Sequence, residues 1–158
     1  RSGDDGLINK TYYELLIGLD LTLFPSYYEP WGYTPLESLA FSVPTATTSL
    51  AGFGVWVEKM YKKPTTGINV VYRNDSNHTQ VVTEVAAIVR NKSRLSEEEA
   101  AQAKENARDV STIALWENQL QYYKQAYAMA LNKMDENMEQ FPVTREECGF
   151  VQKTRVYT

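Results

Sequence analysis

The chain has 158 residues, and its 20 Asp and Glu outnumber its 16 Lys and Arg, which gives a formal net charge of −4. This charge argues against a protein that binds nucleic acid electrostatically. With 43% hydrophobic residues the chain can bury the core of about one domain. No apolar run reaches the ~18 residues of a membrane span, so the sequence predicts a soluble protein.

Cysteine and histidine are too few for several common kinds of site. One cysteine, Cys148, and one histidine, His78, cannot supply a Cys/His zinc site, and Cys148 has no internal disulfide partner. His78 ends the polar run 73–78, a pattern typical of a solvated loop. We therefore expect neither Ser-His-Asp or Cys-His catalysis nor a bound metal. The chain opens without methionine in polar, glycine-containing sequence, which we interpret as a piece of a longer protein.

Helices and strands are predicted to alternate along the first half of the chain. In order they are a helix over 10–18, a strand over 19–24, a helix over 34–42, a strand over 43–48, a helix ending near 62 and a strand over 68–72. For the second helix, Thr34 is the expected N-cap, Pro35 suits the first turn and Glu37 completes a capping box. This alternation is typical of the βαβαβ half of a doubly wound sheet, so we predict an α/β fold with three parallel strands.

The second half is predicted to be helical, over 78–91, 96–110 and 113–134. Ser96 and Glu99 have the spacing of a second capping box. In the last helix an aromatic-rich apolar stripe follows steps of three and four residues, and we expect it to pack against the domain or an absent neighbour. We assign 1–138 to one partial domain and 139–158 to a C-terminal tail.

Ligands of doubly wound sheets bind beyond the carboxyl ends of the strands, here 26–34 and 49–54. The first of these loops leads into a predicted helix whose N–H groups and dipole could hold a phosphate. Glu29 and Glu37 flank that position. Carboxylates accept hydrogen bonds from sugar hydroxyls, so the arrangement suits a sugar nucleotide.

Plainer interpretations of the same residues stay open. Glu37 could be only the capping partner of Thr34, or fill both roles. Glu29 could be a solvated loop residue. Gly52 and Gly54 could serve turn geometry, or lie beside a phosphate or sugar.

The run 24–37, Phe-Pro-Ser-Tyr-Tyr-Glu-Pro-Trp-Gly-Tyr-Thr-Pro-Leu-Glu, closely resembles the E-x7-E region of the glycogen synthases of the animal and fungal type. These are retaining glycosyltransferases of the GT-B architecture. The resemblance continues through Leu-Ala-Gly-Phe-Gly at 50–54 and returns in the last helix, at Trp116, 122–123 and 128–131. It covers about 12–133 and is sparse from 63 to 113.

The resemblance implies specific roles for the site residues. Glu29 would face the transferred glucose and act as the catalytic carboxylate, and Glu37 would bind the ribose hydroxyls. The backbone of Gly32, Tyr33 and Thr34 would hold the diphosphate. The implied substrates are UDP-glucose and an α-1,4-glucan, with no cofactor and no metal, in the cytoplasm.

The chain also departs from the family pattern. Compared with the family, we expect the N-terminal GT-B domain and the first half of the C-terminal one to lie outside the given sequence, and nothing in this sequence resembles the arginine-rich regulatory helix of eukaryotic members. We therefore expect no sugar-phosphate control, and a bacterial origin would fit. The alternatives are a related GT-B transferase that uses ADP-glucose or another acceptor, and a noncatalytic module that binds glucan or a partner.

Overall fold

The structure is a computed structural model that describes residues 6–63 and 65–140. The chain divides into two units, Arg1–Leu115 and Trp116–Thr158. In chain order the first unit contains α1 (Tyr12–Leu16), β1 (Thr22–Leu23), α2 (Tyr33–Ala40), β2 (Thr45–Thr48), α3 (Gly52–Met60), β3 (Ile68–Val71), α4 (His78–Lys92) and α5 (Glu97–Thr112), and the second contains α6 (Trp116–Gln140).

The three strands form one parallel sheet in the order β1-β2-β3. Thr45 pairs with Thr22 on one side and with Ile68 on the other, which sets the register. The predicted parallel βαβαβ arrangement is confirmed. Because all the strands run the same way, the loops that follow them meet at one edge of the sheet.

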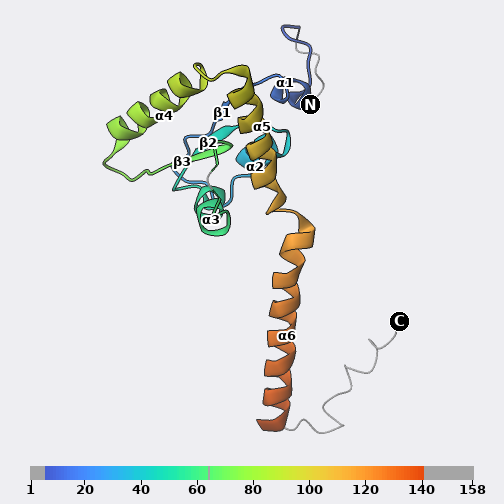
Figure 1. Ribbon diagram of the computed structural model, residues 1–158. Coiled ribbons are helices and arrows are strands. Elements are labelled where there is room, and N and C mark those ends of the chain that lie inside the picture. The colour runs from blue at the N-terminus through green and yellow to red at the C-terminus, as the bar shows by residue number, and fades with distance from the viewer. Residues whose placement is uncertain (1–5, 64, 141–158) are drawn as a thin grey trace. The chain divides into compact units, whose positions relative to one another are not determined.

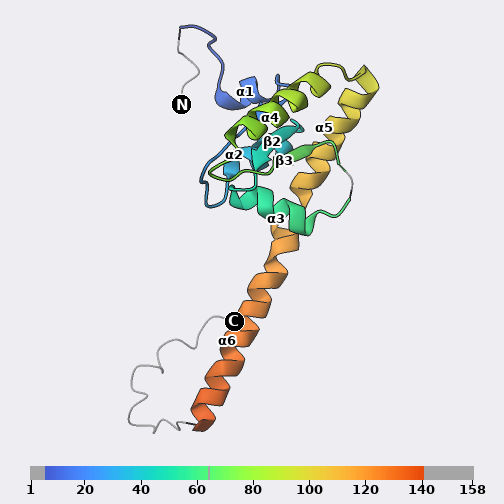
Figure 2. The same cartoon turned by 90° about the vertical axis from the view of Figure 1, so that its left-hand side faces the viewer.

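Helices cover both faces of the sheet, and α3 and α4 lie on opposite sides of it in both views (Figures 1 and 2). The main core joins α2, α3, β3 and α5 through six buried side chains: Leu39, Phe53, Val57, Ile68, Ala107 and Val110. On the other face α4 packs against β3. The sheet is therefore enclosed, as expected for parallel strands whose β2 residues are all buried.

The first strand is shorter than the predicted 19–24. The N–H groups of Gly18 and Leu19 donate to the carbonyls of Leu15 and Leu16, so these residues form the turn that closes α1 instead of joining the ladder.

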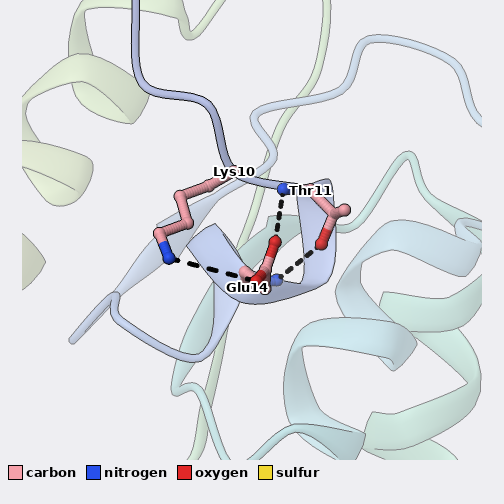
Figure 3. A network of polar contacts seen from close by, with 3 residues as sticks. All are labelled: Lys10, Thr11 and Glu14. Carbon is pink, nitrogen blue, oxygen red and sulfur yellow. Dashed lines mark hydrogen bonds and ion pairs between the residues drawn. The ribbon is translucent and has the colours of Figure 1, made fainter. Parts of the chain in front are cut away.

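Helix α1 begins with a capping box (Figure 3). Thr11 N–H donates to the Glu14 carboxylate (2.7 Å), and Glu14 N–H donates to the Thr11 hydroxyl (3.4 Å). The Lys10 ammonium lies 4.0 Å from the same carboxylate.

The predicted start of the second helix is wrong. Helix α2 begins at Tyr33, and its N-cap is Gly32 at φ 102°, with no side-chain cap. This left-handed conformation suits glycine. Thr34 therefore lies inside the first turn and cannot cap, so the Thr34–Glu37 capping box does not exist. Pro35 does lie in the first turn, as expected.

The C-terminal helices agree with the prediction apart from their ends. Ser96 caps α5 through the expected box with Glu99. Along α6 the stripe residues Trp116, Leu120, Tyr123, Tyr127, Leu131 and Met134 are exposed. The predicted tail 139–158 lies outside the described residues except for 139 and 140, which end α6. Among the described helices, none has the length and apolarity needed to cross a bilayer.

Candidate functional site

The loop that carries Glu29 is fixed at the carboxyl edge of the sheet by main-chain bonds. Glu29 N–H donates to the Leu50 carbonyl (3.4 Å), and the Glu29 carbonyl accepts from Gly52 N–H (3.0 Å). Glu29 thereby forms an isolated parallel bridge with Ala51. One step further, Phe53 N–H donates to the Trp31 carbonyl (2.6 Å). The backbone of Glu29 is therefore held from both sides, while its side chain stays exposed.

Glycines permit this close approach of two chain segments. A Cβ on Gly52 would clash with the Pro30 carbonyl oxygen, and one on Gly54 would come within 2.6 Å of the Thr48 carbonyl oxygen. Both glycines thus have a packing role. The Gly52 N–H is already bonded to Glu29, and contact of either glycine with phosphate or sugar stays a prediction.

Two helix N-termini lie at this edge, and they differ in what their N–H groups do. Those of Gly52 and Phe53, at the start of α3, are bonded to the Glu29 loop. The first-turn N–H groups of α2, at Tyr33 and Thr34, have no acceptor within their own helix. Tyr33 and Thr34 are both exposed, and a Cβ on Gly32 would lie 3.4 Å from Glu29 Cγ. The open helix end and the Glu29 side chain are therefore neighbours.

A cleft of about 700 Å³ opens beside Glu29. The loop residues Tyr28, Glu29 and Pro30 line one side of it, and one face of α3 lines the other, through Gly52, Val55, Trp56 and Lys59. In the described part of the chain no ion pair involves Glu29 or Lys59. The cleft thus combines a free carboxylate, a free ammonium and aromatic surface, which suits a polyhydroxylated ligand.

Glu37 does not line this cleft. It lies farther along α2, partly buried, and its charge is felt by Tyr12 of α1. Burial, and next the Glu37 carboxylate, raise the pKa of the Tyr12 hydroxyl. Of the predicted site residues, Glu29, Gly32 and Gly52 are brought together, while Glu37 faces a different neighbourhood.

Sequence reasoning missed Lys59 and Arg73. Lys59 follows Gly52, Val55 and Trp56 at helical spacing, which would have placed all four on one face. Arg73, expected in a solvated polar run, is 5% exposed. It comes two residues after β3, at the ligand edge of a parallel sheet, and that position was the available signal. The described residues contain no group of three His, Cys, Asp or Glu side chains that could hold a metal ion.

The chain is therefore an α/β module with a parallel sheet, and its candidate site lies at the carboxyl edge of that sheet. A profile of the glycogen synthase family matches residues 2–156, and the chain belongs to this family.

Three relatives illustrate the match. The chain is 29% identical to glycogen [starch] synthase of Caenorhabditis elegans over 134 residues, which are 84% of the chain and 20% of that protein. It is 30% identical to the liver glycogen [starch] synthase of Mus musculus over 133 residues, 84% of the chain and 19% of that protein. Against glycogen [starch] synthase isoform 1 of Saccharomyces cerevisiae it is 35% identical over 88 residues, 54% of the chain and 12% of that protein. The chain therefore spans about a fifth of the length of the first two.

Proposed function

We propose that this chain is the C-terminal part of a cytoplasmic retaining glucosyltransferase of GT-B architecture. The whole protein transfers glucose from UDP-glucose to the non-reducing 4-hydroxyl end of an α-1,4-glucan. One observation above the others supports this proposal. In a chain of the glycogen synthase family, main-chain hydrogen bonds to Leu50 and Gly52 hold Glu29 in place beside the exposed N-terminus of α2.

Each residue then has a physical task. The exposed Glu29 carboxylate stabilises positive charge that develops on the glucose ring in the transition state, and its fixed backbone means that little reorganisation is needed. The Gly32, Tyr33 and Thr34 backbone and the Thr34 hydroxyl receive the diphosphate at the positive end of the α2 dipole. The departing diphosphate oxygen assists the acceptor hydroxyl on the same face of the sugar, which gives retention without a protein nucleophile.

Glu37 is assigned to the ribose hydroxyls. It is partly buried on α2, beyond the turn that receives the diphosphate, which is consistent with the nucleoside lying on that side. Glu29 on the cleft side and Glu37 on the α1 side would then contact opposite ends of the sugar nucleotide.

The direct test is turnover by the full-length parent protein with UDP-glucose and with ADP-glucose, using glycogen as acceptor. We expect extension of α-1,4 chains from UDP-glucose with the anomeric configuration kept, and loss of extension in Glu29→Gln. Faster turnover with ADP-glucose would favour the related transferase. Glycogen affinity that survives Glu29→Gln combined with Glu37→Gln, with no transfer from either donor, would favour a noncatalytic module.

A further inference from the structure

Arg73 is a buried cation at the ligand edge of the sheet. Its side chain is 5% exposed, although a guanidinium is rarely buried without an ionic partner. In the part of the chain that the structure describes, no ion pair involves Arg73, and its Nε is buried without a hydrogen-bond partner. Burying a charged guanidinium without an ionic partner lowers the stability of the fold. The contacts of Arg73 should therefore indicate what it contributes.

Those contacts lead to the segment just before Glu29. The Arg73 Nη1 group donates to the Pro25 carbonyl (2.7 Å), and the guanidinium carbon lies 3.4 Å from the ring centroid of Tyr27. The second contact has the geometry of a cation–π interaction. Together they hold the loop at two positions, four and two residues before Glu29.

The base of Arg73 is itself held by the loop after β2. Its main-chain N–H donates to the Ser49 hydroxyl (2.9 Å), and that hydroxyl donates to the Arg73 carbonyl (3.4 Å). At the end of β2, just before that loop, the Thr48 hydroxyl donates to the Ser26 carbonyl (2.7 Å). Arg73 therefore connects the loop after β3 to the loop after β1, although β1 and β3 are not adjacent in the sheet.

We infer that Arg73 is a positioning residue for Glu29. Arg73 holds residues 25–27 in place, and the main-chain hydrogen bonds to Leu50 and Gly52 hold Glu29. Together these contacts set the direction in which the Glu29 carboxylate enters the cleft. The inference rests on the proposed function for its catalytic meaning. Its structural part, that Arg73 immobilises residues 25–29, does not depend on the proposed function.

The experiment uses the full-length parent and two readouts. Arg73→Met removes both contacts, whereas Arg73→Lys keeps a cation that can lie over the Tyr27 ring. Tyr27→Leu removes the cation–π contact from a half-exposed side chain, and therefore remains testable if Arg73→Met fails to fold. Arg90→Met is the matched control, because Arg90 is an exposed arginine on α4, outside the site.

The first readout is kinetic. We expect kcat to fall about 10- to 100-fold in Arg73→Met, because small misplacements of a reacting group have effects of that size. The dissociation constant for UDP should stay near the wild-type value, Arg73→Lys should recover part of kcat, and the double variant with Tyr27→Leu should be about as slow as Arg73→Met. A loss of kcat that only follows a lowered melting temperature, or an unchanged kcat, would overturn the catalytic inference.

The second readout is hydrogen exchange of the Glu29 amide, which does not depend on activity. We expect it to exchange at least about tenfold faster in Arg73→Met or Tyr27→Leu than in Arg90→Met, while amides of β2 keep their protection. Unchanged Glu29 exchange in Tyr27→Leu and in folded Arg73→Met would overturn the structural part. If the wild-type parent transfers no glucose but the exchange result holds, the proposed function fails and the positioning role stands.

Discussion

Glu29 and Glu37 are the residues whose roles can be separated most directly by kinetics. We predict that in the full-length parent Glu29→Ala lowers turnover far more than nucleotide affinity, whereas Glu37→Ala chiefly weakens nucleotide binding. The reason is that an interaction made mainly in the transition state affects kcat, while a ribose contact is present in both states. The measurements are steady-state kinetics with UDP-glucose and calorimetric titration with UDP.

Glu58→Ala is a suitable control, because Glu58 is exposed on α3 and does not line the cleft. It should leave both quantities unchanged. If the two site variants had equal effects on turnover and on affinity, the assignment of roles would be wrong.

The close approach of Gly52 to the Glu29 loop can be tested by substitution. In Gly52→Ala the new methyl group meets the Pro30 carbonyl oxygen, so the Glu29 loop must move away from α3. We expect a loss of about 1–3 kcal/mol in the free energy of unfolding, typical of overpacking, measured by denaturant titration of this chain. Gly18→Ala, whose Cβ would lie 3.3 Å from the Leu15 carbonyl oxygen, is the milder comparison. Equal stability of the two variants would contradict the close-approach argument.

The role of a single residue was predictable when it depended on neighbours close in the sequence, and not when it depended on distant ones. Glu29 and its glycine neighbours were found because a strand–loop–helix pattern locates the ligand edge. Thr34 was misplaced as a cap, because a left-handed Gly32 is an equally good helix start and the sequence does not choose between them. Arg73 was missed because its burial depends on Pro25 and Tyr27, about fifty residues away, a pairing that no local pattern contains.

At the scale of elements, α5 offers a test of helix capping. Ser96 N–H donates to the Glu99 carboxylate (2.8 Å), and Glu99 N–H donates to the Ser96 hydroxyl (3.2 Å). Helix α5 supplies Ala107 and Val110 to the main core, so fraying of its first turn should be felt by the whole first unit. We predict that Ser96→Ala destabilises this chain by about 1 kcal/mol, seen as a lower melting temperature. Ser93→Ala, a change outside the box, should have a smaller effect.

The same box should make stability depend on pH. The hydrogen bond from the Ser96 backbone, and next that from its hydroxyl, lower the pKa of Glu99 below its usual 4.5. A carboxyl whose pKa is lower in the folded state stabilises the fold above its unfolded pKa, and this contribution is lost as the pH falls through the folded value. We expect the difference in melting temperature between wild type and Glu99→Ala to be full at neutral pH and to shrink below pH 4.5. A difference that stayed constant with pH would show that the charged form is not the one bonded.

Elements were predictable where the local signal agreed with the packing. The order of strands and helices, the parallel sheet and the α5 cap followed from spacing and turn residues. The extent of β1 did not, because Leu19 has strand-like composition, yet its N–H group donates to the Leu16 carbonyl in the turn that closes α1. The acceptor of a backbone N–H group depends on the tertiary structure, and the alternation of apolar and polar residues along a strand does not determine it.

For the whole molecule, the decisive fact is that the chain matches about a fifth of the length of its relatives in worm and mouse. The cleft is lined by the Glu29 loop, the loop after β2 and one face of α3, and we interpret it as one wall of the proposed two-domain active site. In GT-B enzymes, as the resemblance implies, donor and acceptor meet between domains, and closure excludes water.

We therefore predict that this chain alone extends no glucan and binds UDP or UDP-glucose weakly at best. A micromolar dissociation constant requires about −8 kcal/mol of binding free energy. An exposed helix N-terminus such as that of α2 contributes about 0.3–1 kcal/mol of it. Arg73 is buried and bonded to Pro25, so among the described residues that line the cleft the available cation is Lys59, whereas Glu29 opposes an approaching diphosphate. Calorimetry of the isolated chain with UDP-glucose, beside the full-length parent as positive control, measures this directly. Low-micromolar affinity, or glucan extension by the isolated chain, would mean that the site is complete without the second wall.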